Sequence, residues 1–393
     1  MTLRKLFAFA LRNEYLLWIL CLNVLLRLPS LLEPYWYGDE GIYLTLGIGI
    51  RKGLTLYKEI HDNKPPLLYF LAALSGSVFW FRFLLIAWHS ASIVVFNLMA
   101  QRFFDVGRTL KPIFLGKVEF PPLRFSTLAT ALFALVPVFA EGNIANGEIF
   151  QLLPLLVGFW TLWLALDTKT AISRHRLLVG LSGLCFSLAF LLKAPAFLET
   201  FAAGFFAFIV VPFLRSTIWK DRQNILAAII TQLRQIVFTA SPYIFIVSFF
   251  LPILATIVYY SAAGIGEFYV RAAFLQNVSY LSSWQTGSHE ELNATESGIP
   301  GRLLVLGIGL VGIFSLGKFL PLGLTLSLIW FACSLFGALL SGRPYPHYLI
   351  NVIPPAALIV TYGTEQLLSA IARMKLRGSH KLIRIAVIGI AIT

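Results

Sequence analysis

Charged residues are scarce in this sequence. Asp, Glu, Lys and Arg make up 12% of its 393 residues, whereas soluble domains carry roughly 25%. So little charge cannot cover a water-exposed surface, and a soluble fold is excluded. Cysteine is scarcer still: Cys21, Cys185 and Cys333 each lie inside an apolar run, where a small packing residue is expected. They form no Cys-x-x-Cys pair, which excludes that class of metal site.

Repeats and metal-ligand motifs are also missing. The sequence has no internal repeat or low-complexity tract, and its histidines show no His-Glu-x-x-His or comparable spacing. His61, Asp62 and His289 therefore indicate no catalytic metal. No cofactor is indicated, and a divalent cation stays open only as an alternative.

Long apolar runs are what the sequence has instead. Hydrophobic residues make up 58% of the chain and the mean hydropathy is +0.80. The runs divide the chain into about ten or eleven stretches long enough to span a bilayer. We predict an all-α, polytopic protein of the cell membrane, with one domain over residues 1–393. The final run, 383–393, is too short to cross, which favours a chain that continues further. Spans are expected near residues 13–32, 82–103, 125–140, 150–166, 177–193, 196–214, 237–260, 302–317, 319–340 and 346–363.

The distribution of charge predicts the orientation of these spans. The net charge of +13 does not indicate nucleic-acid binding, because the basic residues lie in short loops. A cytoplasmic N-terminus places the most basic loops inside and eleven of the 18 acids outside. This orientation requires residues 67–80 to lie along the outer surface as an interfacial helix. The outer segments are then 33–81, 141–149 and 261–301.

The first outer segment carries an ordered set of unusual residues. Acids and lysines in a loop are often only solvated, and a Pro-Pro pair often only begins a helix. Their order is more specific than any one of them. The set is the acidic pair Asp39-Glu40 with Tyr43 behind it, then Gly53-x-x-x-Tyr57, then Lys64-Pro65-Pro66.

This ordered set resembles the glycosyltransferases of the GT-C fold, in particular the protein mannosyltransferase and lipid A aminoarabinose transferase group, glycosyltransferase family 39. The resemblance is strongest over residues 27–82 and extends more weakly through Glu148 and Lys193 to 343–355. It implies a GT-C-like membrane domain. It also implies a transferase that moves a sugar, with inversion, from a polyprenyl phosphate to an acceptor hydroxyl at the non-cytoplasmic face.

Such a transfer needs a carboxylate that takes the proton of the acceptor and cations that hold the departing phosphate. Asp39 is the expected base and Lys64 the expected phosphate clamp. Glu40 is a second catalytic candidate, which aligns Asp39 or the acceptor or caps a helix near Gly41. Tyr43 is a candidate substrate contact. The resemblance has one departure: the aminoarabinose transferases carry a phosphate-binding arginine where this chain has Ile42.

Two later segments complete the predicted site. In the resembling family a second carboxylate of the 141–149 loop faces the active site, which makes Glu148 the third catalytic candidate; the alternative is a carboxylate stabilised by a helix dipole. Segment 341–348 resembles a basic-Pro-x-Tyr segment of the donor site. Its substrate-binding candidates are Arg343, His347 and Tyr348, and the alternative is a set of interfacial anchors.

Charges inside or beside the spans are suspects for function because burial in lipid is costly. Glu199 is one of them. Arg82 and Lys193 are expected to snorkel to the outer boundary, and Arg27 to pair with an acid of the first outer segment.

The expected partners are a polyprenyl-phosphate-linked sugar, an acceptor glycan, lipid or protein, and membrane lipid, without nucleic acid. A secondary transporter is the rival function, but its charges should line the bilayer midplane, and here the acids gather in outer loops. A catalytically silent lipid-binding subunit is the third alternative, against which the intact ordered set argues. The sequence leaves the sugar, the acceptor and the carrier lipid open.

Overall fold

The computed structural model describes residues 14–34, 37–104, 113–115, 118–120, 123–216, 238–276, 299–343 and 345–373, with single positions at 230 and 234. Most of the predicted outer segment 261–301 lies outside these residues. The elements are α2 (Glu14–Arg27), η1 (Pro29–Leu31), α3 (Gly38–Arg51), α4 (Leu67–Ser75), α5 (Val78–Phe103), β1 (Ile113–Leu115), β2 (Val118–Phe120), α6 (Phe125–Phe139), α7 (Gly147–Ala165), α8 (Ile172–Leu192), α9 (Ala196–Phe205), η2 (Phe206–Val210), α10 (Val211–Arg215), α12 (Ala240–Ala262), α13 (Gly266–Val270), η4 (Arg271–Leu275), α15 (Ile299–Leu316), η5 (Gly317–Phe319), α16 (Leu322–Leu339), η6 (Pro346–Val352) and α17 (Ile353–Arg373).

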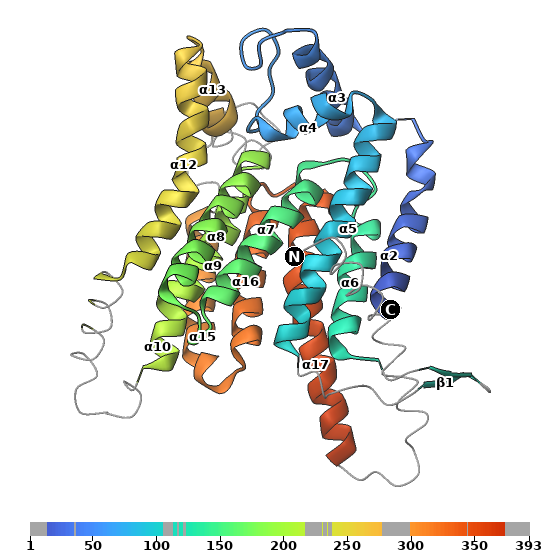
Figure 1. Cartoon of the computed structure of the whole chain (residues 1–393), viewed down its shortest axis with the longest axis vertical. Coiled ribbons are helices and arrows are strands. Elements are labelled where there is room, and N and C mark those ends of the chain that lie inside the picture. The colour runs from blue at the N-terminus through green and yellow to red at the C-terminus, as the bar shows by residue number, and fades with distance from the viewer. Residues whose placement is uncertain are drawn as a thin grey trace.

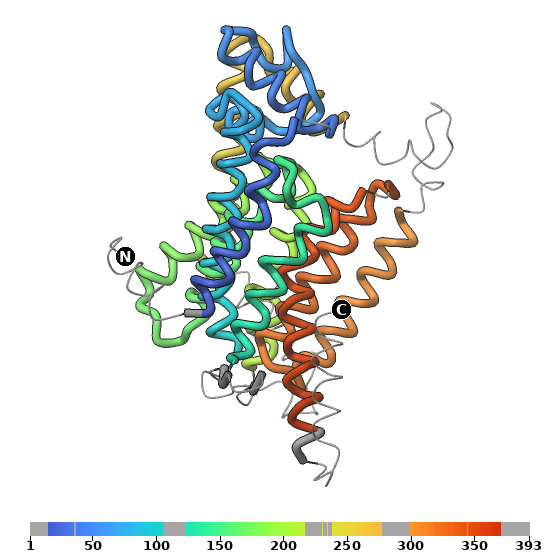
Figure 2. Tube along the Cα trace, turned by 90° about the vertical axis from the view of Figure 1, so that its right-hand side faces the viewer, coloured from blue at the N-terminus to red at the C-terminus, as the bar shows by residue number. Residues whose placement is uncertain are grey.

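The long helices run side by side as a bundle. Helices α3, α4 and α13 gather at one end of it, which we call the α3 end (upper end of Figure 1). Helix α6 packs against α2 and α5 on one side and against α17 on the other, so the N-terminal and C-terminal helices flank it (Figure 2). The two short strands form an antiparallel pair in which Leu115 lies opposite Val118.

Among the described residues, seven helices are long and apolar enough to cross a membrane: α5, α7, α8, α9 with its continuation to Arg215, α12, α15 with its continuation to Phe319, and α16. Two shorter apolar helices cover 15–31 and 125–139. With α17, each predicted span contains a helix. The prediction of an all-α, multi-pass membrane protein is confirmed.

The segment predicted as one interfacial helix, 67–80, is interrupted. Helix α4 ends at Ser75, and the next residue, Gly76, has a φ of 69°, in the left-handed region that glycine adopts without strain. Ser77 then accepts a hydrogen bond from the backbone of Trp80 and caps α5. Helix α4 is therefore a separate element at the α3 end, and α5 begins four residues earlier than expected.

Helices α3 and α4 touch through their backbones. A Cβ added at Gly47 would lie 2.6 Å from the backbone nitrogen of Ala73, closer than packed atoms approach. Buried Tyr43, Leu68 and Tyr69 fill the space beside this contact. The pair forms one compact cover over the end of the bundle.

The arginines beside the spans differ from their expected roles. Arg82 does not snorkel; it is 1% exposed and forms a bidentate ion pair with Glu40. Arg27 does not pair with an acid of the first segment; it donates to the Asn23 side chain and to the carbonyl of Gly142. Both arginines are held by internal partners because α5 and α2 present them to neighbouring elements rather than to the membrane boundary.

Candidate active site

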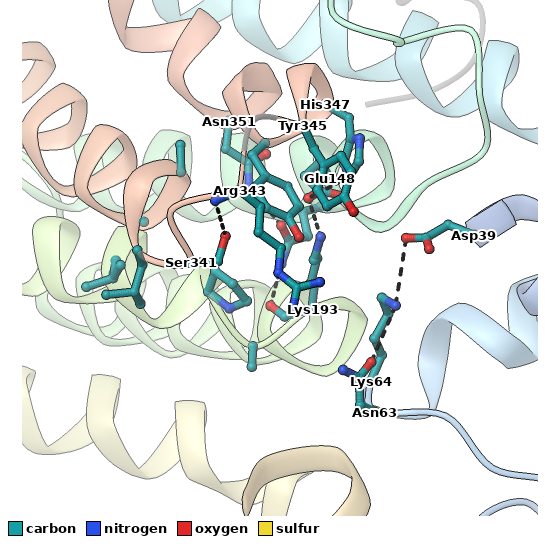
Figure 3. A pocket seen from close by; sticks show the side chains of 18 of the residues that line it. Asp39, Asn63, Lys64, Glu148, Lys193, Ser341, Arg343, Tyr345, His347 and Asn351 are labelled. Atoms are coloured by element: carbon teal, nitrogen blue, oxygen red, sulfur yellow. Dashed lines mark hydrogen bonds and ion pairs between the residues drawn. The ribbon is translucent and has the colours of Figure 1, made fainter. Parts of the chain in front are cut away.

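A cavity of about 680 Å³ opens at the α3 end of the bundle. Its walls come from the start of α3, the 62–65 loop, the first turns of α7 and α9, the last turn of α16, and residues 341–351 (Figure 3). Residues from both halves of the sequence therefore meet here. The charged side chains that line it are Asp39, Asp62, Lys64, Glu148, Lys193, Glu199 and Arg343, with His347 beside them.

Asp39 projects into the cavity from the first turn of α3. Its Oδ2 accepts a hydrogen bond of 2.8 Å from the hydroxyl of Tyr43 and lies 3.8 Å from the Lys64 Nζ. Burial raises the pKa of the carboxyl, but Lys64, the Tyr43 hydrogen bond, Lys193 and His347 outweigh it, and the pKa is lowered from its ordinary value. Asp39 is therefore an ionised carboxylate at neutral pH, able to accept a proton.

Tyr43 lies behind Asp39. It is fully buried and is not among the described residues that line the cavity. Burial and the charge of Asp39 raise its pKa well above the ordinary value, so its hydroxyl stays protonated and keeps donating. This geometry favours a role for Tyr43 in orienting Asp39, and its contact with a substrate stays a prediction.

Lys64 is held by its backbone as well as by its charge. The Tyr57 hydroxyl donates to the Lys64 carbonyl at 2.8 Å, and the Lys64 amide donates to the Tyr69 hydroxyl at 3.2 Å. Its Nζ lies 3.5 Å from Asp62 Oδ2 and 5.0 Å from the centre of the Tyr43 ring. The following prolines restrict the backbone further. The ammonium group is thus fixed beside Asp39.

Glu148 and Lys193 form a second ion pair in the cavity. Glu148 lies in the first turn of α7, where Asn146 caps the helix by accepting from the Ile149 amide. Lys193 Nζ contacts Glu148 Oε1 and lies 4.6 Å from the centre of the Tyr348 ring. Lys193 therefore points into the cavity and does not snorkel. The sequence resemblance extended weakly to Lys193, but Lys193 was not among the predicted site residues.

His347 links the 341–351 wall of the cavity to residues of the first two outer segments. Its Nδ1 lies 2.8 Å from Glu141 Oε2 and 3.0 Å from the Tyr37 hydroxyl, and its Nε2 lies 3.9 Å from Glu148 Oε1. A carboxylate at this distance favours the tautomer that carries a proton on Nδ1. Burial, then Glu141 and Asp39, raise the pKa of Tyr37, which stays a neutral hydroxyl.

Arg343 follows a turn made by Gly342, whose φ is 66°. Its backbone amide donates to the Ser341 hydroxyl at 3.4 Å. Figure 3 shows its guanidinium directed toward Lys193, on the other side of the cavity from Lys64. Three cations, Lys64, Lys193 and Arg343, thus line one space.

Glu40 is separate from this space. It is fully buried, its Oε1 and Oε2 lie 2.9 and 2.6 Å from nitrogens of Arg82, and the amide of Ala145 donates to it at 3.2 Å. It is not among the described residues that line the cavity. Glu40 ties α3 to α5 and to the 141–146 loop, and so positions Asp39 next to it in sequence. Among the roles predicted for Glu40, these contacts favour the alignment of Asp39.

A metal site is not evident in the part of the chain that the structure describes, since no group of three His, Cys, Asp or Glu side chains there is arranged to hold an ion. His61 instead contacts Gln276, with 3.1 Å between Nε2 and Oε1.

Comparison with known proteins identifies the fold. No protein-family model and no curated protein sequence matches the chain. Solved structures do. The oligosaccharyltransferase of Archaeoglobus fulgidus tethered to an acceptor peptide is 12% identical over 97% of this chain and 54% of its own, with a TM-score of 0.54. The same organism's oligosaccharyltransferase AglB, in complex with an inhibitory peptide and a dolichol-phosphate, is 14% identical over 96% and 54%, with a TM-score of 0.52.

A more distant match is ArnT from Cupriavidus metallidurans bound to undecaprenyl phosphate, at 14% identity over 92% of this chain and 63% of its own, with a TM-score of 0.46. The chain spans about half the length of the oligosaccharyltransferases. It is a polytopic membrane protein with the GT-C fold, as its ordered sequence motifs predicted.

Proposed function

We propose that this chain is a membrane glycosyltransferase that moves a sugar from a polyprenyl-phosphate carrier to an acceptor hydroxyl. The observation that carries the proposal is a cavity in which the Asp39 carboxylate lies beside Lys64 and which Lys193 and Arg343, from two other parts of the sequence, also line. The solved structures of the same fold that contain dolichol-phosphate and acceptor peptide support it.

The proposed reaction uses these groups in one step. Asp39 takes the proton of the acceptor hydroxyl as its oxygen attacks the anomeric carbon. The bond from that carbon to the phosphate oxygen breaks, and the electron pair leaves on the polyprenyl phosphate. Lys64, Lys193 and Arg343 stabilise the growing negative charge, with His347 and Tyr348 beside them. Attack opposite the leaving phosphate inverts the anomeric configuration.

The cavity also has the apolar wall that a prenyl chain needs. Phe197 and Leu198 of α9 and Ala338 and Leu340 at the end of α16 line it. Phe197 is half exposed on the outside of the bundle, where a membrane protein meets lipid. A polyprenyl phosphate can therefore reach the cations from within the bilayer.

Loss of the gene provides the direct test of this function. The lipid-linked sugar that accumulates is expected to be consumed again when the wild-type chain is restored. If the restored wild-type chain consumed no lipid-linked sugar but recovered the flux of a water-soluble solute, the result would favour a transporter instead.

The site is proposed to face the non-cytoplasmic side. Arg102 ends α5, Arg124 precedes α6, and Arg174 and Arg176 lie at the start of α8, all at the end of the bundle away from α3. Basic residues of this kind remain on the cytoplasmic side. In a cysteine-free background, Glu59→Cys should react with an impermeant thiol reagent added to sealed cells, and Arg176→Cys should not. The reverse pattern would contradict the orientation.

Lys64 and Arg343 are expected to share one lipid phosphate. Lys64→Ala and Arg343→Ala should each weaken the binding of undecaprenyl phosphate by about 1.5 to 3 kcal/mol, the usual strength of charge-assisted contacts. The double variant should lose less than the sum, because the two residues share a partner. Binding in nanodiscs measures all three. Lys58→Ala, outside the cavity, is the control, and additive or negligible losses would contradict a shared phosphate.

A further inference from the structure

One wall of the cavity carries hydrogen-bond acceptors that the proposed reaction does not use. Glu199 of α9 is 3% exposed and lines the cavity. Its Oε1 accepts from the Ser334 hydroxyl at 3.0 Å, and its Oε2 has no hydrogen-bond partner among the described residues. Asn351 of η6, 7% exposed, lines the same cavity, and its Oδ1 also lacks a partner there.

The orientation of Asn351 is determined by its neighbours. The amide nitrogen of Gln151 donates to the carbonyls of Ala189 and Lys193, so its oxygen must face Asn351. The Asn351 nitrogen donates to that oxygen at 2.8 Å. The Asn351 oxygen is therefore left without a donor among the described residues. The same holds for Glu199 Oε2 and Glu148 Oε2. These three oxygens are all hydrogen-bond acceptors.

A buried acceptor that faces a ligand needs a donor from that ligand. The polyprenyl chain has no hydrogen-bond donor. The phosphate oxygens accept hydrogen bonds, and their negative charge would repel Glu199. Of the three parts of the lipid-linked donor, only the sugar offers hydroxyl or amino groups that donate. Glu199 lies in the first turn of α9 and lines the same cavity as Lys193, so a sugar whose phosphate rests on that cation shares this space with Glu199.

We propose that Glu199, together with Asn351, binds the hydroxyl or amino groups of the transferred sugar and determines which sugar is accepted. This inference rests on the proposed function, since it takes the ligand to be a polyprenyl-phosphate sugar. A site built to accept hydrogen bonds discriminates strongly, because a sugar without a donor at that position leaves the buried carboxyl unpaired.

Three lipids separate this proposal from the function on which it rests: undecaprenyl phosphate alone, undecaprenyl-phosphate hexose, and the same carrier with an amino sugar. Their binding to the full chain in nanodiscs is compared for the wild type and Glu199→Ala. The variant should bind the bare lipid as the wild type does and should bind the accepted sugar lipid at least tenfold more weakly. Glu267→Ala, which removes an exposed carboxylate of α13 outside the cavity, should change nothing.

Glu199→Gln and Asn351→Ala provide a second measurement where Glu199→Ala does not fold. Glutamine keeps an acceptor, so a hydroxyl partner predicts hexose binding within a few-fold of wild type, whereas an ammonium partner predicts at least a tenfold loss for the amino sugar. Equal binding of both sugar lipids by wild type and the folded variants, with bare-lipid binding intact, would overturn the inference alone. Failure of the wild type to bind any of the three lipids would overturn the proposed function and this inference with it.

Discussion

Replacing Asp39 with asparagine is expected to slow sugar transfer by a factor of about 100 to 10,000, the usual contribution of a general base. The amide keeps the shape of the side chain and can still accept from the Tyr43 hydroxyl, which lies 2.8 Å from the carboxylate in the native protein. It cannot take the acceptor's proton. Single-turnover transfer from the accumulated lipid-linked sugar measures the loss.

Binding of the donor should survive this substitution, because the three cations that we propose to hold the phosphate are unchanged. Glu59→Gln is the matched control, since Glu59 is an exposed carboxylate of the same segment that does not line the cavity. Transfer by Asp39→Asn at the wild-type rate would refute the assignment. Loss of donor binding in the same variant would make Asp39 a binding group.

Glu40→Gln is expected to destabilise the fold by about 3 to 5 kcal/mol, the usual cost of removing one partner from a buried ion pair. Glu40 and Arg82 are 0% and 1% exposed. Without the carboxylate, the guanidinium keeps only neutral acceptors, including the carbonyls of Ser30 and Glu33. Thermal unfolding in detergent, followed as a shift in midpoint, measures the effect.

A structural role for Glu40 also predicts how fast the folded Glu40→Gln variant transfers sugar. At a temperature where Glu40→Gln is folded, it should retain transfer within about tenfold of wild type, unlike Asp39→Asn. Glu33→Gln, which changes an exposed acid at the start of the same segment, is the control. An unchanged unfolding midpoint, or complete loss of transfer in the folded variant, would return Glu40 to the list of catalytic groups.

Hydropathy was sufficient to locate the spans, because the free energy of placing apolar residues in lipid depends on local composition. It does not report which face of a helix meets which neighbour. Arg82 and Lys193 were both expected to snorkel, and both instead find carboxylates, 42 and 45 residues away in sequence. A charged side chain near the membrane boundary can either snorkel to the surface or pair inside the protein. Which of the two occurs here depends on where α3 lies relative to α5 and α7 relative to α8.

Local order in the sequence was more informative than any long-range inference. Asp39 and Lys64 lie in one short segment of the sequence. The tyrosine of the Gly-x-x-x-Tyr motif, Tyr57, holds Lys64 in place by donating a hydrogen bond to its carbonyl. The contact of Tyr37 with His347 spans 310 residues. No periodicity predicts such a contact, because it depends on how α6 packs against both α2 and α17.

The three cations of the cavity have a consequence for turnover. The phosphate of a polyprenyl-phosphate sugar is a diester with one negative charge, whereas the lipid left after transfer is a monoester that carries about −1.5 to −2 near neutral pH. Lys64, Lys193 and Arg343 should hold this product more tightly than the substrate. Asp62 and Glu148, already within ion-pair distance of Lys64 and Lys193, are the counter-ions that compete for those lysines and help to expel it. For the proposed transfer we therefore expect release of the spent carrier, rather than chemistry, to be the slow step. A burst of glycosylated acceptor equal to the enzyme present would reveal it.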